Sequence, residues 1–285
     1  MNKVPIFFMG NKEKLIKKGL VDKFPNNINT FYDLFGGSGV VSINTNAKKI
    51  IYNDTDKNII GLIEYFRNNN PSYILDSINN VIDTYGLPTF STDTRKFKGD
   101  REIYKIAYNK LRKDYNETRD VLLLYVLNIF SNSHMLRYNS TGDFNMPFRN
   151  GYLTEQCKEN ILNNKYNAIN DIYNKDFYEL KECKFNEDDF VYLDPLYLNT
   201  TATYNENGGW TIEHEDKMYE LCEYLNHKNI RFAISNIFHN KGVKNDKLID
   251  LVNKNNFNVY HFDDFTYCSC GKGNSNTDEV LITNY

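Results

Sequence analysis

The sequence predicts an α/β protein in which an open sheet domain is interrupted by a helical insertion. Short apolar segments that end in turns, such as Thr30–Asp33 and Phe190–Leu193, alternate with amphipathic segments in the two end regions. From Gly61 to about Asn163 this alternation stops and helical periodicity takes over. With 285 residues, 41% of them hydrophobic, the chain is long enough for one large domain or for one domain with an insertion.

The first part of the sheet domain is built around a glycine-rich turn. Thr30–Asp33 is expected to be a buried strand, and the turn after it to lead into a helix that begins near Val40. Lys49–Tyr52 makes the next strand, which ends in Asn53 and Asp54. Upstream, the sequence predicts a short strand or extended segment and then a helix with one apolar side, at Val4–Met9 and around Leu15, Ile16 and Leu20.

The glycine-rich turn indicates a ligand that contains adenosine. Its residues are Asp33, Leu34, Phe35, Gly36, Gly37, Ser38 and Gly39. Glycines let the backbone approach a ligand closely and direct its N–H groups toward it. Asp54, about twenty residues further on, stands where a carboxylate can hold both hydroxyls of a ribose. The dinucleotide pattern G-x-G-x-x-G is absent, and an acidic turn favours a ligand with a positive charge and no phosphate. S-adenosyl-L-methionine is such a ligand.

The middle of the chain is predicted to be helical and to contain one hairpin. The expected helices are Arg101–Tyr115, with Ile103, Ala107 and Leu111 on one face, and the almost wholly apolar Val121–Phe130. Ser140–Asp143 is typical of a hairpin turn. The polar and aromatic side chains around it can reach base edges, although on composition alone an ordinary surface loop is the more frequent explanation.

After residue 166 the α/β pattern resumes. The expected elements are strand Phe190–Leu193, helix Glu213–Asn226 with Met218, Leu221, Cys222 and Leu225 inward, strand Ile230–Ile234, helix Asp246–Asn253, and strands Phe257–Phe262 and Glu279–Thr283. Residues 268–276, rich in Gly, Ser and Asn, are expected to form a loop.

Charge is unevenly distributed along the chain. The net charge is -3, which argues against a uniformly basic nucleic-acid coat. Between Arg95 and Arg119, however, nine basic residues stand against four acidic ones. Phosphate contacts need only such a local patch. A solvated helix face is the more frequent reason for a run of this kind.

Metal and membrane sites are not expected. The five cysteines are an odd number without C-x-x-C spacing, and Cys268 with Cys270 is too isolated a pair for a zinc site. The longest apolar run, Val121–Leu127, is far shorter than a membrane span, and no signal peptide is recognised. We therefore expect a soluble, cytoplasmic protein with no metal and no membrane partner.

Asp194, Pro195, Leu196 and Tyr197 form the turn with the clearest chemistry. The exocyclic amine of adenine is a poor nucleophile, because its lone pair is delocalised into the ring. Acceptors for its hydrogens, the Asp194 carboxylate and the Pro195 carbonyl, can draw the amine toward tetrahedral geometry, and Tyr197 can stack on the base. The base has to leave the duplex first. Taken alone, a strand that merely ends in an Asp-Pro turn is an equally good interpretation.

Several motifs occur in an order that matches a known enzyme family. They are Phe8–Lys12 (aromatic-x-Gly-x-Lys), Asp33–Gly39 (Asp-x-Phe-x-Gly-x-Gly), the strand end Asn53–Asp54, the hairpin Phe130–Arg149 with its Arg-x-Asn and Asn-x-Pro-Phe, the turn Asp194–Tyr197, and the closing strand Thr277–Val280. Over nearly the whole length the chain resembles the Dam-type (D12 class) adenine-specific DNA methyltransferases, most closely the small bacteriophage members.

The resemblance implies a fold and a reaction. The fold is a Rossmann-like methyltransferase sheet with an inserted helical target-recognition domain. Residues 1–61 plus 164–285 would bind S-adenosyl-L-methionine and carry catalysis, and residues 62–163, with a hairpin near 135–149, would recognise DNA. The reaction is methyl transfer to N6 of a flipped adenine, with GATC as the expected target. The partner is double-stranded DNA, the protein is expected to be a monomer, and its compartment is the bacterial host cytoplasm.

The resemblance also assigns site residues. Catalytic roles fall to Asp194, Pro195 and Tyr197. Cofactor contacts fall to Phe8, Lys12, Asp33, Phe35, Gly36, Gly37, Ser38, Gly39, Asp54 and Asp194. DNA contacts fall to Arg137, Asn139, Pro147 and Arg149. An arginine bidentate to guanine is the commonest specific major-groove contact, and a phosphate clamp is the alternative for Arg137.

Two positions depart from the family pattern. Leu196 replaces the second proline of Asp-Pro-Pro-Tyr, so the geometry of the Pro195 carbonyl is permitted but not enforced. We expect a slower or looser site, and the alternative is a catalytically impaired DNA-binding or inhibitory protein. After Phe148 the chain has Arg149, Asn150 and Gly151 in place of the family's Gly and basic residue, which leaves the outer bases of the target open. An RNA or protein methyltransferase is disfavoured by the hairpin.

Overall fold

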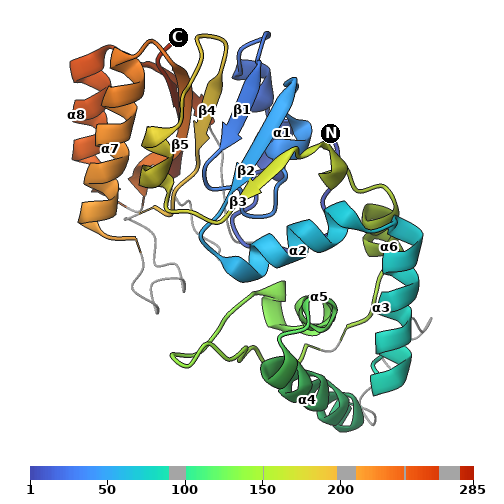
Figure 1. The fold of residues 1–285 in the computed structure, drawn as a ribbon. Coiled ribbons are helices and arrows are strands. Elements are labelled where there is room, and N and C mark those ends of the chain that lie inside the picture. The colour runs from blue at the N-terminus through green and yellow to red at the C-terminus, as the bar shows by residue number, and fades with distance from the viewer. Residues whose placement is uncertain (90–100, 150, 198–209, 241, 263–276) are drawn as a thin grey trace. The chain divides into compact units, whose positions relative to one another are not determined.

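The structure is a computed structural model that describes residues 1–89, 101–149, 151–197, 210–240, 242–262 and 277–285 (Figure 1). The chain divides into two compact units, each assembled from separate segments. The helical unit comprises Met1–Asn11, Gly37–Ile43 and Asp56–Ala168, and the sheet unit comprises Lys12–Gly36, Asn44–Thr55 and Ile169–Tyr285.

The sheet unit contains the strands of a single eight-stranded sheet, as far as the chain is described. The strands are β1 (Thr30–Asp33), β2 (Lys49–Asn53), β3 (Asp171–Tyr173), β4 (Phe190–Leu193), β5 (Arg231–Asn240), β6 (Val243–Lys244), β7 (Asn258–Phe262) and β8 (Thr277–Thr283). Their order is β3-β2-β1-β4-β5-β8-β7, with β6 paired to β5. The pairs from β3 to β5 are parallel, whereas β8 runs antiparallel to both β5 and β7.

Both faces of the central strands are covered by apolar side chains of the same unit. The helices and short 3-10 segments of the sheet unit are α1 (Glu13–Lys17), η1 (Val21–Lys23), η6 (Phe177–Glu182), α7 (Ile212–His227) and α8 (Asp246–Asn255). Met218 of α7 and Leu248 of α8 join Val191 and Leu193 in one core cluster, and Figure 1 shows the two helices side by side. On the other face Phe24 packs 4.8 Å from the ring of Phe190. A strand buried on both faces needs an uninterrupted apolar sequence, as β4 has.

The helical unit is organised around one almost wholly buried helix. Its helices are α2 (Lys57–Asn68), α3 (Pro71–Tyr85), α4 (Arg101–Thr118), α5 (Val121–Phe130) and α6 (Glu155–Leu162), with 3-10 turns η4 (Asn132–His134) and η5 (Tyr166–Ala168). The seven residues from Leu124 to Phe130 are all buried, and Asp120 caps α5 by accepting from the N–H groups of Leu122 and Leu123. No helix in the described ranges has the length and apolarity that a membrane crossing requires.

A β-hairpin follows α5 in the helical unit. Ser131 and Phe148 form one antiparallel bridge, and Tyr138 and Phe144 form another. Between these bridges the Asn145 N–H donates to the carbonyl of Arg137 at 3.1 Å. Phe144 is fully buried and packs edge-on to Tyr115 of α4, so the hairpin is fixed to the helices of its own unit.

The α/β class with a central sheet is confirmed, and most predicted elements occur within two or three residues of their expected bounds. Val4–Met9, expected to be a short strand or an extended segment, is not a strand. Two local predictions were wrong. The expected helix at Val40 is only the 3-10 turn η2 (Ser42–Asn44), because the connection to β2 is short and its first residues are packed in the interior. Ile103 is 62% exposed, since the buried face of α4 is formed by Tyr108, Leu111 and Tyr115.

The two compact units also differ from the domain bounds expected from the sequence. Residues 1–11 and 37–43 belong to the helical unit. The reason is local: the Tyr125 hydroxyl donates to the Pro5 carbonyl at 3.1 Å, and the Phe7 N–H donates to Oδ1 of the buried Asn128 at 3.2 Å. These side chains of α5 bind the backbone of the N-terminal segment. Such contacts cannot be predicted from the apolar periodicity of that segment.

Candidate active site

The carboxyl ends of β1 and β4 are adjacent where the strand order of the sheet reverses. From β1 the sheet continues through β2 to β3, and from β4 it continues to β5. Crevices at such switch points hold the ligands of open α/β sheets. Asp33, the last residue of β1, is in register with Tyr192, two residues before Asp194. The fold therefore brings two predicted site carboxylates, Asp33 and Asp194, to the same end of neighbouring strands.

Lys12, Asp194, Tyr197 and Glu279 form a group that we call the carboxyl-end cluster, in which Lys12 and Glu279 are buried and Asp194 and Tyr197 are partly buried. Lys12 Nζ lies 2.8 Å from Oδ1 of Asp194 and 3.8 Å from Oε1 of Glu279. It also donates to the Tyr197 hydroxyl at 2.9 Å. That hydroxyl lies 3.4 Å from Oδ1 of Asp194 and 3.3 Å from Oε1 of Glu279, so its one proton can be donated to either carboxylate. The start of α1, the turn after β4 and strand β8 thus meet at one point.

The cluster carries more negative than positive charge. Burial raises the pKa of Asp194 to about 6, against the lowering effect of Lys12 and with a further rise from the Glu279 carboxylate. Burial alone would lower the pKa of Lys12, but attraction to Asp194 and Glu279 outweighs it and raises that pKa. The cluster thus places the side chains of two acidic residues around one lysine. Such a site is suited to a cationic ligand.

The two residues that follow Asp194 in the β4 turn have different surroundings. Pro195 is buried, whereas the side chain of Leu196 is 42% exposed. Leu196 therefore fills little of the interior and makes no contribution to the carboxyl-end cluster. The turn nevertheless delivers Tyr197 to Lys12 Nζ, which lies 5.1 Å from the centre of its ring.

The first half of the glycine turn belongs to the sheet unit and requires glycine. A Cβ atom at Gly36 would lie 2.0 Å from the ring of Tyr52. The Gly36 N–H donates to the Asn53 carbonyl at 2.8 Å, and the Asn53 amide donates to the Leu34 carbonyl at 3.0 Å. Asn53 thus holds the turn against the end of β2. Asp54, which follows it, is partly exposed.

The second half of the turn belongs to the helical unit. Gly37 and Gly39 have φ values of 49° and 72°, in the left-handed region that favours glycine. A Cβ atom at Gly37 would lie 3.0 Å from the ring of Phe8, so this predicted cofactor-binding ring lies against the turn. The hydroxyl of the buried Tyr166 donates to the Ser38 carbonyl at 2.6 Å and fixes the backbone there.

The ring of Phe35 is partly buried and packs against the core of the sheet unit. It packs 5.1 Å from Phe177 and 5.6 Å from Trp210, all within the sheet unit. The ring of Phe35 is therefore engaged by aromatic neighbours within the sheet unit.

The four predicted DNA-contacting residues all lie on the hairpin. Arg137 Nε donates to Oδ1 of Asn145 at 2.8 Å, which holds the guanidinium along the opposite strand of the hairpin. Pro147 is exposed. Arg149 contacts Nε2 of His134, and the His134 ring stacks on Phe7 with centroids 4.1 Å apart.

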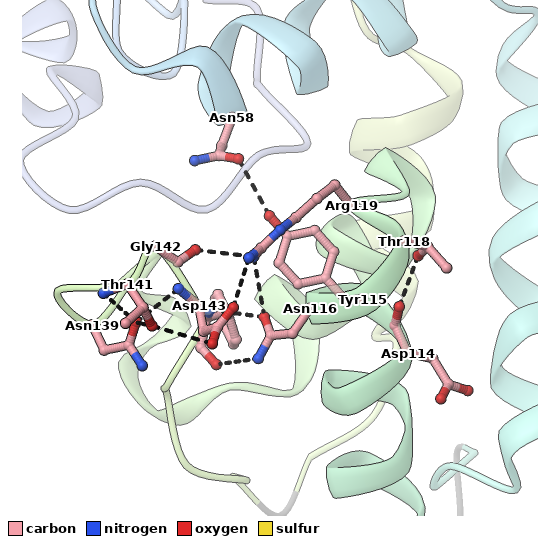
Figure 2. A network of polar contacts seen from close by, with 11 residues as sticks. Asn58, Asp114, Tyr115, Asn116, Thr118, Arg119, Asn139, Thr141, Gly142 and Asp143 are labelled. Atoms are coloured by element: carbon pink, nitrogen blue, oxygen red, sulfur yellow. Dashed lines mark hydrogen bonds and ion pairs between the residues drawn. The ribbon is translucent and has the colours of Figure 1, made fainter.

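Asn139 serves the turn of the hairpin. Its Oδ1 accepts from the N–H of Thr141 at 3.1 Å, from the Thr141 hydroxyl at 2.7 Å and from the N–H of Asp143 at 2.8 Å. Arg119, just after α4, donates to the carbonyl of Gly142 at 2.9 Å and pairs with Asp143 at 2.6 Å (Figure 2). We call Asn139–Asp143 with these partners the hairpin-tip network.

Asn116 fastens the hairpin to α4. Its Oδ1 accepts from the Phe144 N–H at 2.8 Å, and its Nδ2 donates to the Phe144 carbonyl at 3.2 Å. One side chain therefore pairs with a backbone as a neighbouring strand would. The tip is shaped before any ligand arrives.

Sequence reasoning did not assign three of these residues. Glu279 lies in one of the motifs of the resemblance, but no role was assigned to it. A carboxylate directly before the apolar run Val280–Ile282 could have been taken as a signal of a buried, functional acidic residue. Arg119 and Asn116 lie in a charged stretch whose members look alike in the sequence. Cys268 and Cys270 fall outside the described residues, and Cys157, Cys183 and Cys222 are free thiols.

The chain matches known DNA-modifying proteins. A family profile, "D12 class N6 adenine-specific DNA methyltransferase", covers residues 8–267. Modification methylase StsI of Streptococcus sanguinis is 35% identical over 99% of this chain and 43% of its own length. Type II methyltransferase M.FokI of Planomicrobium okeanokoites is 30% identical over 99% and 43%. DNA adenine methylase of Escherichia coli (strain K12) is 28% identical over 58% and 64%. The chain thus spans less than half the length of the first two relatives.

Proposed function

We propose, because the chain belongs to the D12 class N6 adenine-specific DNA methyltransferase family, that it transfers the methyl group of S-adenosyl-L-methionine to N6 of an adenine in double-stranded DNA. The observation that carries the proposal is the placement of Asp194. Its carboxylate follows β4 at the switch point of the sheet and is paired with a buried lysine. Open α/β sheets bind their ligands at this switch point, and a carboxylate is the group that the reaction needs.

Asp194 acts as the acceptor for the target amine. Above a pH of about 6 it is ionised, and its oxygens can accept the N6 hydrogens. The carbonyl of Pro195, one residue on, provides the second acceptor. Drawing both hydrogens out of the ring plane localises the nitrogen lone pair, which then attacks the methyl carbon. The adenine has to leave the helix for this contact, and Tyr197 offers it a ring to stack on.

The residues present fit the cofactor. S-adenosyl-L-methionine supplies an electrophilic methyl group on a sulfonium cation. The carboxyl-end cluster places two acidic side chains beside one lysine, a donor set that suits a cation. Gly36 and Gly37 pack so closely against the rings of Tyr52 and Phe8 that a side chain at either position would clash with or crowd them. We infer that Lys12, Asp33, Asp54 and Asp194, with Phe8 and the glycine turn, hold the cofactor.

The hairpin is proposed to read the DNA. Arg137 and the exposed Pro147 lie along it, and the hairpin-tip network keeps its shape. GATC, expected from the likeness to Dam-type enzymes, is the first target to test. StsI and M.FokI methylases, however, align with more of the chain and at higher identity than the DNA adenine methylase of Escherichia coli does. We therefore include in the proposal that the protein modifies DNA in partnership with a restriction endonuclease. Its target sequence has to be measured without assuming GATC.

The first experiment measures label transfer from methyl-labelled S-adenosyl-L-methionine to two duplexes, one with GATC and one with that site scrambled. Label on the first alone would support adenine transfer at GATC. Label on both, followed by single-molecule sequencing of methylated plasmid DNA, would replace GATC with the sequence that is modified. The product must be N6-methyladenine, and label in another base would refute the adenine assignment.

Leu196 motivates one competing function, a DNA-binding protein that does not turn over. Its exposed side chain disfavours that function, because the substitution leaves the cluster of Lys12, Asp194 and Tyr197 assembled. Absence of label on every duplex, combined with measured binding of cofactor and DNA, would favour the DNA-binding protein without turnover.

A further inference from the structure

Glu279 is a buried carboxylate in an otherwise apolar stretch of β8. It is fully buried, and it is followed by the buried residues Val280, Leu281 and Ile282. It stands opposite Ile237 of β5, where the β5–β8 register shifts between Ile237 and His239. Bulges of this kind redirect a side chain and are frequent beside active sites. Glu279 thereby reaches the turn after β4.

The contacts of Glu279 use only part of its hydrogen-bonding capacity. Oε1 lies 3.3 Å from the Tyr197 hydroxyl and 3.8 Å from Lys12 Nζ. Oε2 is buried and has no partner among the described residues. Burying an incompletely paired carboxylate is costly, and a glutamine or an apolar residue would cost less there. A functional requirement for the charge explains why the protein tolerates it.

The requirement follows from competition for Asp194. Lys12 Nζ lies 2.8 Å from Oδ1 of Asp194, an atom that the target amine also needs. If Asp194 were the only anion near Lys12, the ammonium would hold that oxygen tightly. Glu279 supplies a second anion for Lys12, and it gives the Tyr197 hydroxyl an acceptor other than Asp194.

We propose that Glu279 is a positioning residue of the methyl-transfer site, which fixes the Tyr197 ring through its hydroxyl and shares Lys12 with Asp194 so that Asp194 keeps an oxygen for the target amine. This inference rests on the proposed function. Glu279 acts through Tyr197 and Lys12 and touches neither the methyl group nor the amine. Its effect should therefore appear in the rate of the methyl-transfer step more than in cofactor affinity.

Glu279→Gln tests the proposal, because it keeps the shape of the side chain and removes its charge. We expect the single-turnover rate to fall about tenfold or more, the size of coupling that contacting residues show. Affinity for S-adenosylhomocysteine should change much less. The control is Asp189→Asn: Asp189 is also fully buried, but it precedes β4, at the opposite end of the strand, and it accepts from the Thr30 N–H. The control should keep the rate, and an equal loss in both variants would mean a general effect of removing a buried charge.

Tyr197→Phe provides the second variant, since it removes the hydroxyl and keeps the ring. If Glu279 acts through that hydroxyl, Glu279→Gln should reduce the rate much less in the Tyr197→Phe background than in the native protein. Fully additive losses would contradict the proposed route through Tyr197. Tyr197→Phe also keeps the test possible if Glu279→Gln does not fold.

A titration separates this inference from the proposed function. Carbon-13 NMR of labelled aspartate in the whole protein should give a lower pKa for Asp194 in Glu279→Gln than in the native protein, because a negative neighbour has been removed. An unchanged Asp194 pKa would overturn the inference even in an active enzyme. A native protein that methylates no DNA would refute the proposed function alone, and the titration would still decide the role of Glu279.

Discussion

The turn after β4 and the turn of the hairpin both place polar side chains around a short loop, yet they differ in how their hydrogen bonds are used. In the hairpin-tip network Asn139 Oδ1 accepts three hydrogen bonds from its own turn, and Arg119 neutralises the partly exposed Asp143. In the carboxyl-end cluster two carboxylates share one lysine, and a buried oxygen of Glu279 lacks a partner among the described residues. The first arrangement is complete in itself and sets a shape. The second leaves charge and hydrogen-bonding capacity for a ligand.

The largest effect is expected from a substitution that disrupts the carboxyl-end cluster. Asp194→Ala removes the acceptor for the target amine and should lower the methyl-transfer rate about a hundred- to ten-thousandfold in a single-turnover assay. Asp143→Ala, which removes the carboxylate of the hairpin tip, should keep that rate at saturating DNA, because an exposed ion pair contributes little. Substantial turnover in Asp194→Ala would refute its catalytic role.

Next in size is the dependence on pH. The pKa of Asp194 is raised to about 6, so the rate should fall by about tenfold per pH unit below that value as the carboxylate is protonated. Because the folded protein holds this proton more tightly than the unfolded chain does, the group's contribution to the free energy of unfolding decreases as the pH rises from 3.8 to about 6. A rate profile flat between pH 5 and 7 would mean that Asp194 is not the titrating acceptor.

Arg137→Ala tests the role of the hairpin in target recognition. If Arg137 reads a base, its loss should relax discrimination at one position of the target by roughly 1–3 kcal/mol, measured as relative kcat/KM over a duplex set with single substitutions. The rate on saturating cognate DNA should change far less than in Asp194→Ala. A uniform loss over all sequences would assign Arg137 to a phosphate.

Asn116→Ala tests whether the hairpin is held by α4. Losing both hydrogen bonds to the Phe144 backbone should lower the free energy of local opening by about 1–3 kcal/mol, seen as faster hydrogen exchange of the Phe144 amide. Asn109→Ala, at an exposed position of the same helix, is the control and should leave that exchange unchanged. Equal exchange in both variants would show that Phe144 is held by its packing alone.

The smallest effect is expected for Leu196→Pro. Proline would pre-set the Pro195 carbonyl, and the exposed Leu196 side chain leaves nothing to repack, so the rate should be equal or a few-fold higher. A clear loss of rate would mean that the native turn depends on a conformation that proline cannot adopt.

Strands and amphipathic helices were predictable, because burial imposes a period on the sequence. Phe190–Leu193 and Val121–Phe130 were placed at their observed bounds. All four residues predicted to face inward from α7 are buried, and Glu215 and Tyr219 are buried with them. The resemblance also named Lys12, Asp194 and Tyr197, which the structure brings into contact.

What the sequence could not supply are the contacts between distant segments. Glu279 joins the cluster only because β8 lies beside β5, and Phe7 belongs to the helical unit only because Asn128 binds its backbone. The missing helix at Val40 has the same origin. Packing of the short connection overrode a local pattern that was otherwise compatible with a helix.

The place of β8 in the sheet also affects how the protein is made. β8 follows the other described strands of the sheet in the sequence, but it lies in the interior of the sheet, paired with β5 and β7. During synthesis β5 and β7 leave the ribosome without the strand that joins them, and their edges remain open until residues 277–283 emerge. Glu279 arrives with that strand, so a nascent chain has neither a closed sheet nor a complete carboxyl-end cluster until residues 277–283 have been synthesised.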